Sequence, residues 1–191
     1  MPALAEATAP ALRRQPRGAQ ITIPAIAGDG SLYPVEKLAA HQLGLRHVAI
    51  SAFVFDGPRL LIQRRALGKY HCGGLWANTV CSHPHWGESP AAAAARRLEE
   101  ELGLRVGLSP AGEFDYRADV GAGLIEDEHV HMFLGRAGAD AALYPDPEEV
   151  AETRWVTREA MQAEIAAAPE RFTPWFRIYV GRWPAFDFGT V

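Results

Sequence analysis

Hydrophobic and polar positions along the chain predict strands and helices packed around one core. Alternating or continuous apolar runs bounded by Gly, Pro and Asp are typical of strands. Asp56-Gly57-Pro58 separates two such runs by a turn, which predicts a β-hairpin. The predicted strands cover residues 21–27, 47–55, 59–65, 112–116, 126–134 and 153–156.

One helix has both of its ends signalled in the sequence. Ser89 is suited to the N-cap, Pro90 to the first helical position and Gly103 to the position after the last turn. Between them, Ala94, Leu98 and Leu102 recur every fourth residue as a core-facing stripe. Three further helices are predicted, a short one starting at Pro34, one over 158–167, and one opening at Thr173-Pro174-Trp175.

These elements mix strands and helices without the regular alternation of a doubly wound fold. We therefore predict an α+β fold, a mixed β-sheet sandwich flanked by helices. With 191 residues and 48% hydrophobic residues, the chain is long enough for one domain. Residues 1–20, rich in Ala, Pro and Arg, are predicted to form a disordered tail without a secretory signal.

Composition narrows the function classes. A net charge of −4 gives no reason to expect a nucleic-acid partner, and no apolar run approaches the roughly 20 residues that cross a membrane. The two cysteines, Cys72 and Cys81, form no CxxC pair, which fits a reducing cytoplasm. The sequence leaves the oligomeric state open.

The segment 66–87 has no sustained period and predicts a long loop, a kind of segment that is often functional. It holds both cysteines, three of the seven histidines and Lys69. Lys69 and Lys37 are the only lysines beside 17 arginines, which draws attention to both positions.

Two carboxylates suggest a cation site. Glu126 and Glu128 lie on one face of a predicted strand, and their charges repel unless a cation lies between them. With the imidazoles of His41, His47 and His83 they would suit Mn²⁺, Mg²⁺ or Zn²⁺. A solvated strand edge and a zinc pair made by Cys81 and His83 are the alternatives.

The segment from Gly87-Glu88 through 96–104 resembles the Nudix signature, in which a glycine loop leads into a glutamate-rich helix. Two positions differ, because the signature has Gly at Ser82 and Glu at Arg97. A cation at Arg97 replaces one of the acidic groups that gather magnesium for diphosphate hydrolysis, which favours holding a diphosphate over cleaving it.

Six segments carry a narrower resemblance within that superfamily: 36–41, 64–67, Trp76-Ala77-Asn78-Thr79-Val80-Cys81-Ser82-His83-Pro84, Tyr116-Arg117-Ala118, Glu126-Asp127-Glu128 and Thr173-Pro174-Trp175-Phe176. In this order they resemble the type I isopentenyl diphosphate isomerases, from about residue 21 to 180, which leaves 181–191 as a predicted C-terminal tail. The resemblance implies interconversion of isopentenyl and dimethylallyl diphosphate, a step in isoprenoid precursor biosynthesis, with no flavin or nicotinamide.

Site roles are implied by the same resemblance. Cys81, as a thiolate, would remove a proton on one face of the alkene, while Glu128 with Tyr116 would deliver one on the other, and Trp175 would face the carbocation. His41, His47, His83, Glu126 and Glu128 would ligate the metal, with Glu101 on a second Mg²⁺ at the diphosphate. Lys37, Arg65, Lys69 and Arg97 would bind the diphosphate itself.

Some features depart from the family or leave alternatives. Cys72-Gly73-Gly74 stands where an aromatic residue and Pro-Gly are expected, and the spacing from His41 to His47 is one residue shorter. A Nudix pyrophosphohydrolase acting on a nucleotide-like diphosphate is the second hypothesis. A metal-bound regulatory or scaffold module on the same fold is the third.

Overall fold

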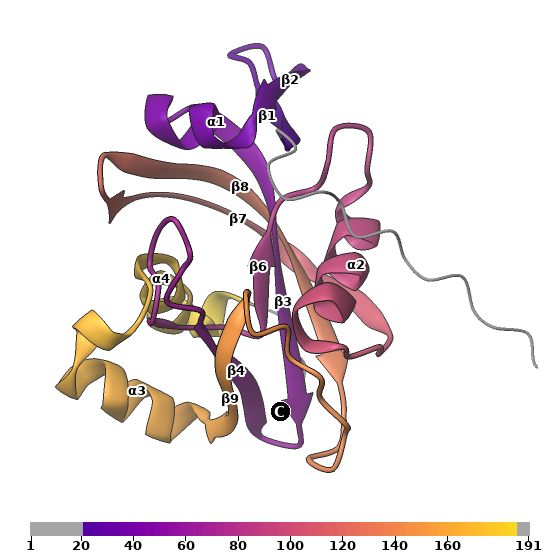
Figure 1. Ribbon diagram of the computed structural model, residues 1–191, viewed down its shortest axis with the longest axis vertical. Helices are drawn as coiled ribbons and strands as arrows, with labels where there is room; N and C mark the ends of the chain where they lie inside the picture. Colours follow the sequence, from indigo (N-terminus) through magenta and orange to yellow (C-terminus); the bar gives the residue numbers. More distant parts are fainter. Residues whose placement is uncertain (1–20, 187–191) are drawn as a thin grey trace, which may run out of the picture.

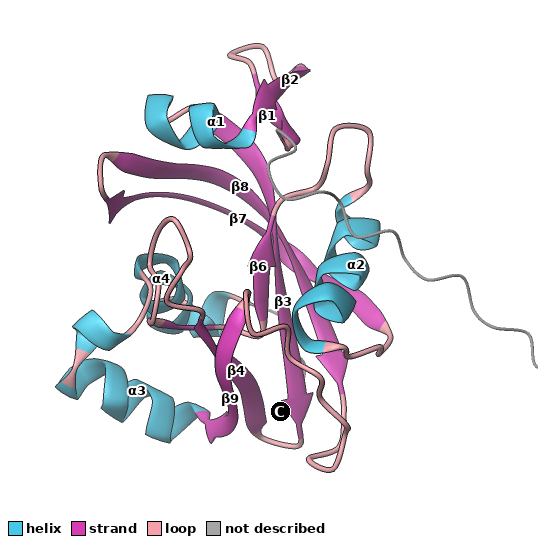
Figure 2. Cartoon of the chain, in the orientation of Figure 1, coloured by secondary structure: helices cyan, strands magenta, loops and turns pink. Residues whose placement is uncertain are grey.

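The computed structural model of the chain describes residues 21–186 (Figure 1). Its strands are β1 (Thr22–Ile26), β2 (Leu32–Glu36), β3 (Arg46–Asp56), β4 (Arg59–Arg65), β5 (Trp76–Ala77), β6 (Val80–Ser82), β7 (Leu108–Gly121), β8 (Leu124–Arg136) and β9 (Val150–Thr157). Its helices are α1 (Lys37–Leu43), α2 (Pro90–Leu102), α3 (Arg158–Ala167) and α4 (Pro174–Gly181), with 3-10 turns at Pro169–Arg171 and Trp183–Ala185. The predicted α+β class is confirmed (Figure 2).

Strand β3 organises the sheet. It runs parallel to β8, from the pair Arg46 and Asp127 to the pair Phe55 and Arg136, and antiparallel to β1, β4 and β6. Strands β7 and β8 form a long antiparallel hairpin, and β4 also pairs with β9. The sheet is therefore mixed, as predicted, and the hairpin from β3 to β4 is confirmed.

Helices cover both faces of β3, so its side chains are buried on both sides. Ala49 and Phe53 join the core under α4, whereas the intervening Ile50 and Ala52 join the core under α2. Figure 1 shows α2 and α4 on opposite sides of the strand. Burial on both faces explains why this segment is a continuous apolar run instead of an alternating one.

Helix α2 has the predicted ends. Ser89 Oγ accepts a hydrogen bond from the Ala92 amide over 3.2 Å, and Gly103 takes a left-handed φ of 62°. The predicted stripe of Ala94, Leu98 and Leu102 is fully buried. Burial of each leucine contributes about 1.5–3 kcal/mol, which fixes this helix against β3.

The prediction of a helix starting at Pro34 is wrong. Pro34 lies in β2, opposite Pro24 of β1, and the helix begins at Lys37 with the Glu36 carboxylate accepting from the first free amides. A proline lacks the N–H that a central strand needs, but β2 pairs with β1 alone, so the edge position tolerates it.

Other boundaries shift outward. Strands β7 and β8 exceed their predicted spans at both ends because backbone pairing continues past polar residues. The predicted loop 66–87 contains the short strands β5 and β6. Residues 1–20 and 187–191 lie outside the described part of the chain, so the N-terminal tail stays a prediction.

The first residues of the predicted C-terminal tail belong to the fold. The Trp183 side chain is buried and packs edge-to-face on Phe53 and Phe55, with ring centroids 6.3 and 6.0 Å apart. Within residues 21–186, no helix has the length and apolar character required to cross a membrane.

Candidate active site

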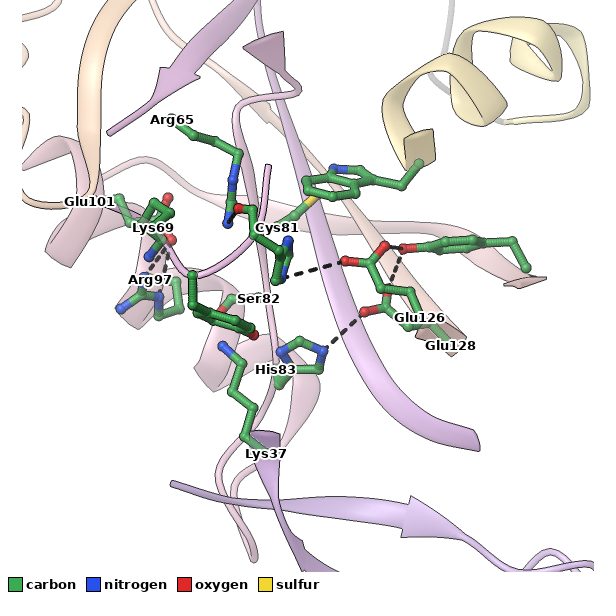
Figure 3. A pocket seen from close by; sticks show the side chains of 14 residues that line it. Lys37, Arg65, Lys69, Cys81, Ser82, His83, Arg97, Glu101, Glu126 and Glu128 are labelled. Atoms are coloured by element: carbon green, nitrogen blue, oxygen red, sulfur yellow. Dashed lines mark hydrogen bonds and ion pairs between the residues drawn. The ribbon is translucent and has the colours of Figure 1, made fainter. Parts of the chain in front are cut away.

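A pocket opens between strands β6, β7 and β8, the end of β4 and the loop after it, the start of α1, and helices α2 and α4 (Figure 3). All predicted site residues line it except His41 and His47, which belong to the buried cluster at its inner end. The lining residues are Lys37, Arg65, Lys69, Tyr70, His71, Cys81, Ser82, His83, Arg97, Glu101, Tyr116, Glu126, Glu128 and Trp175.

Four of the predicted metal ligands, three histidines and one glutamate, lie close together at the inner end of the pocket. His41 comes from α1, His47 from β3, His83 from the loop after β6 and Glu128 from β8, and one ligand atom of each lies within 4.8 Å of the others. The register places His47 directly beside Glu128 on adjacent parallel strands. His83 Nε2 lies 3.0 Å from Glu128 Oε1 and 3.1 Å from His47 Nε2.

Backbone carbonyls orient two of the imidazoles. His41 Nδ1 lies 2.7 Å from the Lys37 oxygen, and His47 Nδ1 lies 2.7 Å from the Leu45 oxygen. Each Nδ1 therefore donates its proton to a carbonyl oxygen. The lone pair on Nε2 is then available to bind a metal ion. The Nε2 atom of His41 is buried and has no hydrogen-bond partner. Between His41 and His47 the chain turns at Gly44, whose φ is 58°.

The carboxylates of Glu126 and Glu128 lie close together and are buried, so a positive charge beside them would stabilise both. Tyr116 Oη lies 2.7 Å from both Glu126 and Glu128, although a hydroxyl has only one proton to donate. Burial, followed by the charge of Glu128, raises the pKa of Glu126 well above its usual value. Burial also disfavours the Glu128 carboxylate, but contacts with His47 and His83 outweigh it and lower the pKa of Glu128.

This donor set fits a divalent cation. Neutral imidazole nitrogens and carboxylate oxygens are ligands for Mn²⁺, Zn²⁺ and Mg²⁺, and burial lowers the pKa of His41 to about 4, which keeps it neutral. The cation would satisfy the free His41 nitrogen and offset the repulsion between the two carboxylates. The zinc pair of Cys81 and His83 finds no support, because the Cys81 thiol lies in none of the metal-capable groups of the described chain.

His71 is a site residue that the sequence reasoning did not single out. Its Nε2 lies 3.9 Å from Glu126 Oε1, and its ring stacks on His41 with centroids 5.8 Å apart. His71, His41 and Glu126 form a second buried group that could hold a metal. The only sequence signal was its place in the long loop, two residues after Lys69.

Four cations gather at the outer end of the pocket. Lys37, Arg65, Lys69 and Arg97, the residues expected to bind the diphosphate, all line it. Burial first, and then the charges of Arg97, Lys69 and Arg65, lower the pKa of Lys37 to about 7. The Arg65 Nε is buried without a partner, and its guanidinium lies 5.3 Å from the Trp175 ring. Such a cluster suits a multiply charged anion.

Two carboxylates balance part of this charge. Arg97 donates to Glu101 through Nε at 3.1 Å and Nη2 at 2.6 Å, and it lies 3.2 Å from Glu149, which also pairs with Lys69. Glu101 also accepts from Gln63 at 2.7 Å. Glu149, just before β9, is a second residue that the sequence reasoning missed, because nothing local distinguishes it from a solvated loop glutamate.

Cys81 on β6 is held by polar neighbours. Its Sγ donates to Asn78 Oδ1 over 2.8 Å and lies 3.0 Å from Ser51 Oγ, which bonds Tyr179. Burial, opposed by the Ser51 hydrogen bond, raises the pKa of the Cys81 thiol above its usual value. The resting group favoured by these surroundings is the neutral thiol, whereas the sequence expectation was a thiolate.

The backbone at Cys72-Gly73-Gly74, where the sequence departs from the family pattern, favours the residues found there. Cys72 takes a left-handed φ of 52°, a conformation that a following proline would disfavour. A Cβ on Gly73 would lie 2.6 Å from the Leu67 carbonyl oxygen, so no side chain fits there. The loop still directs Arg65, Lys69 and His71 into the pocket.

Known proteins with similar sequences identify the family of this chain. The NUDIX domain model matches residues 45–176. The isopentenyl-diphosphate Delta-isomerase of Dinoroseobacter shibae is 57% identical over 165 residues, which cover 85% of this chain and 93% of the relative. That of Cereibacter sphaeroides strain ATCC 17025 is 60% identical over 154 residues, covering 80% and 86%. This chain belongs to the isopentenyl-diphosphate Delta-isomerase family.

Solved structures confirm the fold that this isomerase family shares with other NUDIX proteins. DR0079 from Deinococcus radiodurans superposes with a TM-score of 0.68 at 19% identity, covering 84% of this chain and 98% of that one. The Nudix hydrolase RenU from M. smegmatis gives a TM-score of 0.55 at 20% identity, covering 85% and 92%. The predicted family and Nudix-like fold are therefore confirmed.

Proposed function

We propose that this chain interconverts isopentenyl and dimethylallyl diphosphate by moving a proton on and off the alkene. The observation that carries the proposal is one pocket with proton-transfer groups at its inner end and four cations at its outer end. Cys81, Tyr116 and Glu128 line this pocket together with Arg65 and Arg97.

The cationic end would hold the diphosphate. Arg65 presents a buried, unpartnered Nε, and Lys37 lies among three further cations whose repulsion an anion relieves. The diphosphate is bound away from the reacting carbons, and its contacts do not change during the reaction. Its binding energy can therefore be used to position the alkene.

The inner end would exchange two protons. Protonation of the terminal methylene gives a tertiary carbocation, and loss of a proton from the carbon on its other side forms the new double bond. Cys81 and Glu128 serve these two transfers on opposite faces, with Tyr116 bonded to Glu128. Because the reaction is an interconversion, each group donates in one direction and accepts in the other. Trp175 supports the cation through its ring.

A divalent ion held by His41, His47, His83, Glu126 and Glu128 would supply positive charge that keeps both carboxylates together in the dry end of the pocket. The nitrogen and oxygen set leaves Mn²⁺, Zn²⁺ and Mg²⁺ as the candidates. Glu101, facing the diphosphate end, would share a Mg²⁺ with the substrate. The isomerisation involves no net oxidation or reduction, so neither flavin nor nicotinamide is required.

Hydrolysis of a diphosphate is the competing activity on this fold. Arg97 stands where the Nudix signature has a glutamate, and it neutralises Glu101 through two hydrogen bonds. That pairing removes acidic capacity from the place where a hydrolase gathers magnesium. A cytoplasmic location is part of the proposal, since Cys72 and Cys81 are free thiols and Cys81 is needed as one.

The test is incubation of the full chain with isopentenyl diphosphate and Mg²⁺ in deuterated water. We expect dimethylallyl diphosphate with solvent deuterium in the methyl group formed from the terminal methylene. Release of phosphate with no isomer would instead support a hydrolase. Tight binding of metal and diphosphate with neither product would support the regulatory module.

A further inference from the structure

A second histidine pair lies on strand β8, on the face opposite the active site. His129 and His131 are two residues apart and alternate with Glu128 and Val130, which point into the pocket and the core. In the β7–β8 register, His131 lies directly opposite Glu113. The side chains of His129 and His131 are 26% exposed and that of Glu113 is 58% exposed, so solvent ions reach the cluster.

The three side chains are spaced as ligands. His131 Nδ1 lies 3.2 Å from Glu113 Oε1, and His129 Nε2 lies 3.5 Å from Glu113 Oε2. These separations are at or beyond the upper end of ordinary N–H···O hydrogen bonds. Around a tetrahedral zinc ion with bonds of about 2.0–2.2 Å, neighbouring ligand atoms lie about 3.3–3.6 Å apart. One ligand atom from each residue falls within 4.8 Å of the other two.

A carboxylate already orients one of the imidazoles. His129 Nδ1 lies 2.8 Å from Asp115 Oδ1, which places the donor proton on that nitrogen and directs the Nε2 lone pair toward Glu113. Arg46 anchors Asp115 in turn, at 2.8 Å. Metal-bound histidines commonly donate a hydrogen bond from their other ring nitrogen to a carboxylate. His129 already makes this hydrogen bond to Asp115, as a metal ligand would.

We propose that Glu113, His129 and His131 form a second divalent-metal site of the zinc class, separate from the active site. His129 binds through Nε2, His131 through Nδ1 and Glu113 through its carboxylate, with water in the fourth position. Because Glu113 belongs to β7 and both histidines to β8, the ion links the two strands of the hairpin. The inference depends on this surface alone and not on the proposed isomerase activity.

The test is zinc titration of the chelator-treated full chain, with stoichiometry and affinity read by competition with a chromophoric chelator. His129→Asn/His131→Asn removes the site. His85→Asn is the matched control, since His85 belongs to none of the metal-capable groups of residues 21–186. Glu113→Gln keeps both imidazoles and covers the case in which the double variant fails to fold.

We expect the natural chain and His85→Asn to bind one more zinc ion per chain than the double variant, with a Kd of about 10 μM or tighter. Glu113→Gln should weaken that ion about tenfold or more. Long-range ¹H–¹⁵N spectra should show zinc-induced shifts at His129 Nε2 and His131 Nδ1. Equal stoichiometry in all variants, an extra ion weaker than about 100 μM, or shifts at the other ring nitrogens would overturn the proposal.

Discussion

The Sγ atom of Cys81 donates a hydrogen bond to Oδ1 of Asn78 over 2.8 Å. The Asn78 amide is itself fixed, because its nitrogen donates to the backbone oxygens of Ala52 and Val80, both at 3.1 Å. A thiol with one rigid neighbour keeps its direction when a substrate enters, which is a requirement for transferring a proton to a defined carbon.

Cys81→Ser should lower kcat by about 10²–10⁴-fold, because a hydroxyl gives up its proton far less readily than a thiol while keeping the size and the hydrogen bond to Asn78. Inorganic pyrophosphate affinity should change little, since the cations that hold it are untouched. Turnover and pyrophosphate titration measure the two effects. Turnover close to that of the natural chain would show that Cys81 is a packing residue.

Arg97→Ala should lower kcat/KM about 10- to 150-fold, corresponding to the loss of a charged hydrogen bond worth about 1.5–3 kcal/mol. The variant also leaves the buried Glu101 without its positively charged partner, with only the Gln63 amide still donating to it. Arg96→Ala is the control, because it removes the same charge one position earlier, where the side chain pairs with Glu88 and Glu100 outside the pocket. Equal effects of the two variants would remove Arg97 from the diphosphate site.

His83→Ala should strip the active-site metal, whereas His85→Ala should not. The two residues are neighbours in the same loop, but only His83 reaches Glu128, at 3.0 Å. Its loss removes one of the proposed ligands, so we expect metal affinity at that site to fall at least 10- to 100-fold. Metal content by elemental analysis after gel filtration gives the readout. Retention of the full metal content by His83→Ala would contradict the assignment.

Pyrophosphate affinity should fall as pH rises above about 7, because burial and the neighbouring cations lower the pKa of Lys37 to about 7. Below that pH the free protein already carries the ammonium group. Above it, binding must first take up a proton, and affinity drops by up to about tenfold per pH unit. Lys37→Arg keeps its charge throughout this pH range. The ratio of the pyrophosphate affinities of the natural chain and Lys37→Arg therefore separates the titration of Lys37 from that of pyrophosphate. A constant ratio from pH 6 to 9 would contradict the lowered pKa of Lys37.

The same lowered pKa sets the sign of a stability effect. Between pH about 7 and 10.5 the unfolded chain holds the Lys37 proton while the folded chain has lost it. The free energy of unfolding should therefore rise with pH across that window, relative to Lys37→Met. Denaturant titrations of metal-free protein at pH 7 and 9 measure the difference.

Gly73→Ala should destabilise the chain by about 1–3 kcal/mol, because the added Cβ meets the Leu67 carbonyl oxygen at 2.6 Å and the backbone must move. Gly68→Ala, in the same loop, meets no atom within 4 Å and should have little effect. Thermal unfolding of both variants gives the comparison. Identical midpoints would show that the loop is free to shift.

Elements with local signals could be predicted from the amino-acid sequence. Ser89, Pro90 and Gly103 mark the ends of α2 because capping depends on residues within one turn. The Glu126 and Glu128 pair followed from strand periodicity, and the Asn-Thr-Val-Cys-Ser-His-Pro run carried the family. The helix predicted to start at Pro34 was wrong because the fixed φ of proline suits both the first turn of a helix and an edge strand. Pairing with β1 makes this segment a strand.

Contacts between residues far apart in the sequence became known from the folded chain. His71 lines the pocket because the loop after β4 folds over the sheet. Glu149 pairs with Arg97 because the segment before β9 returns to α2, and no local pattern encodes either approach. Glu113 meets His131 only through the register of β7 on β8. The protonation states of Cys81 and Glu128 were likewise beyond the sequence, because burial and partners from separate strands set each pKa.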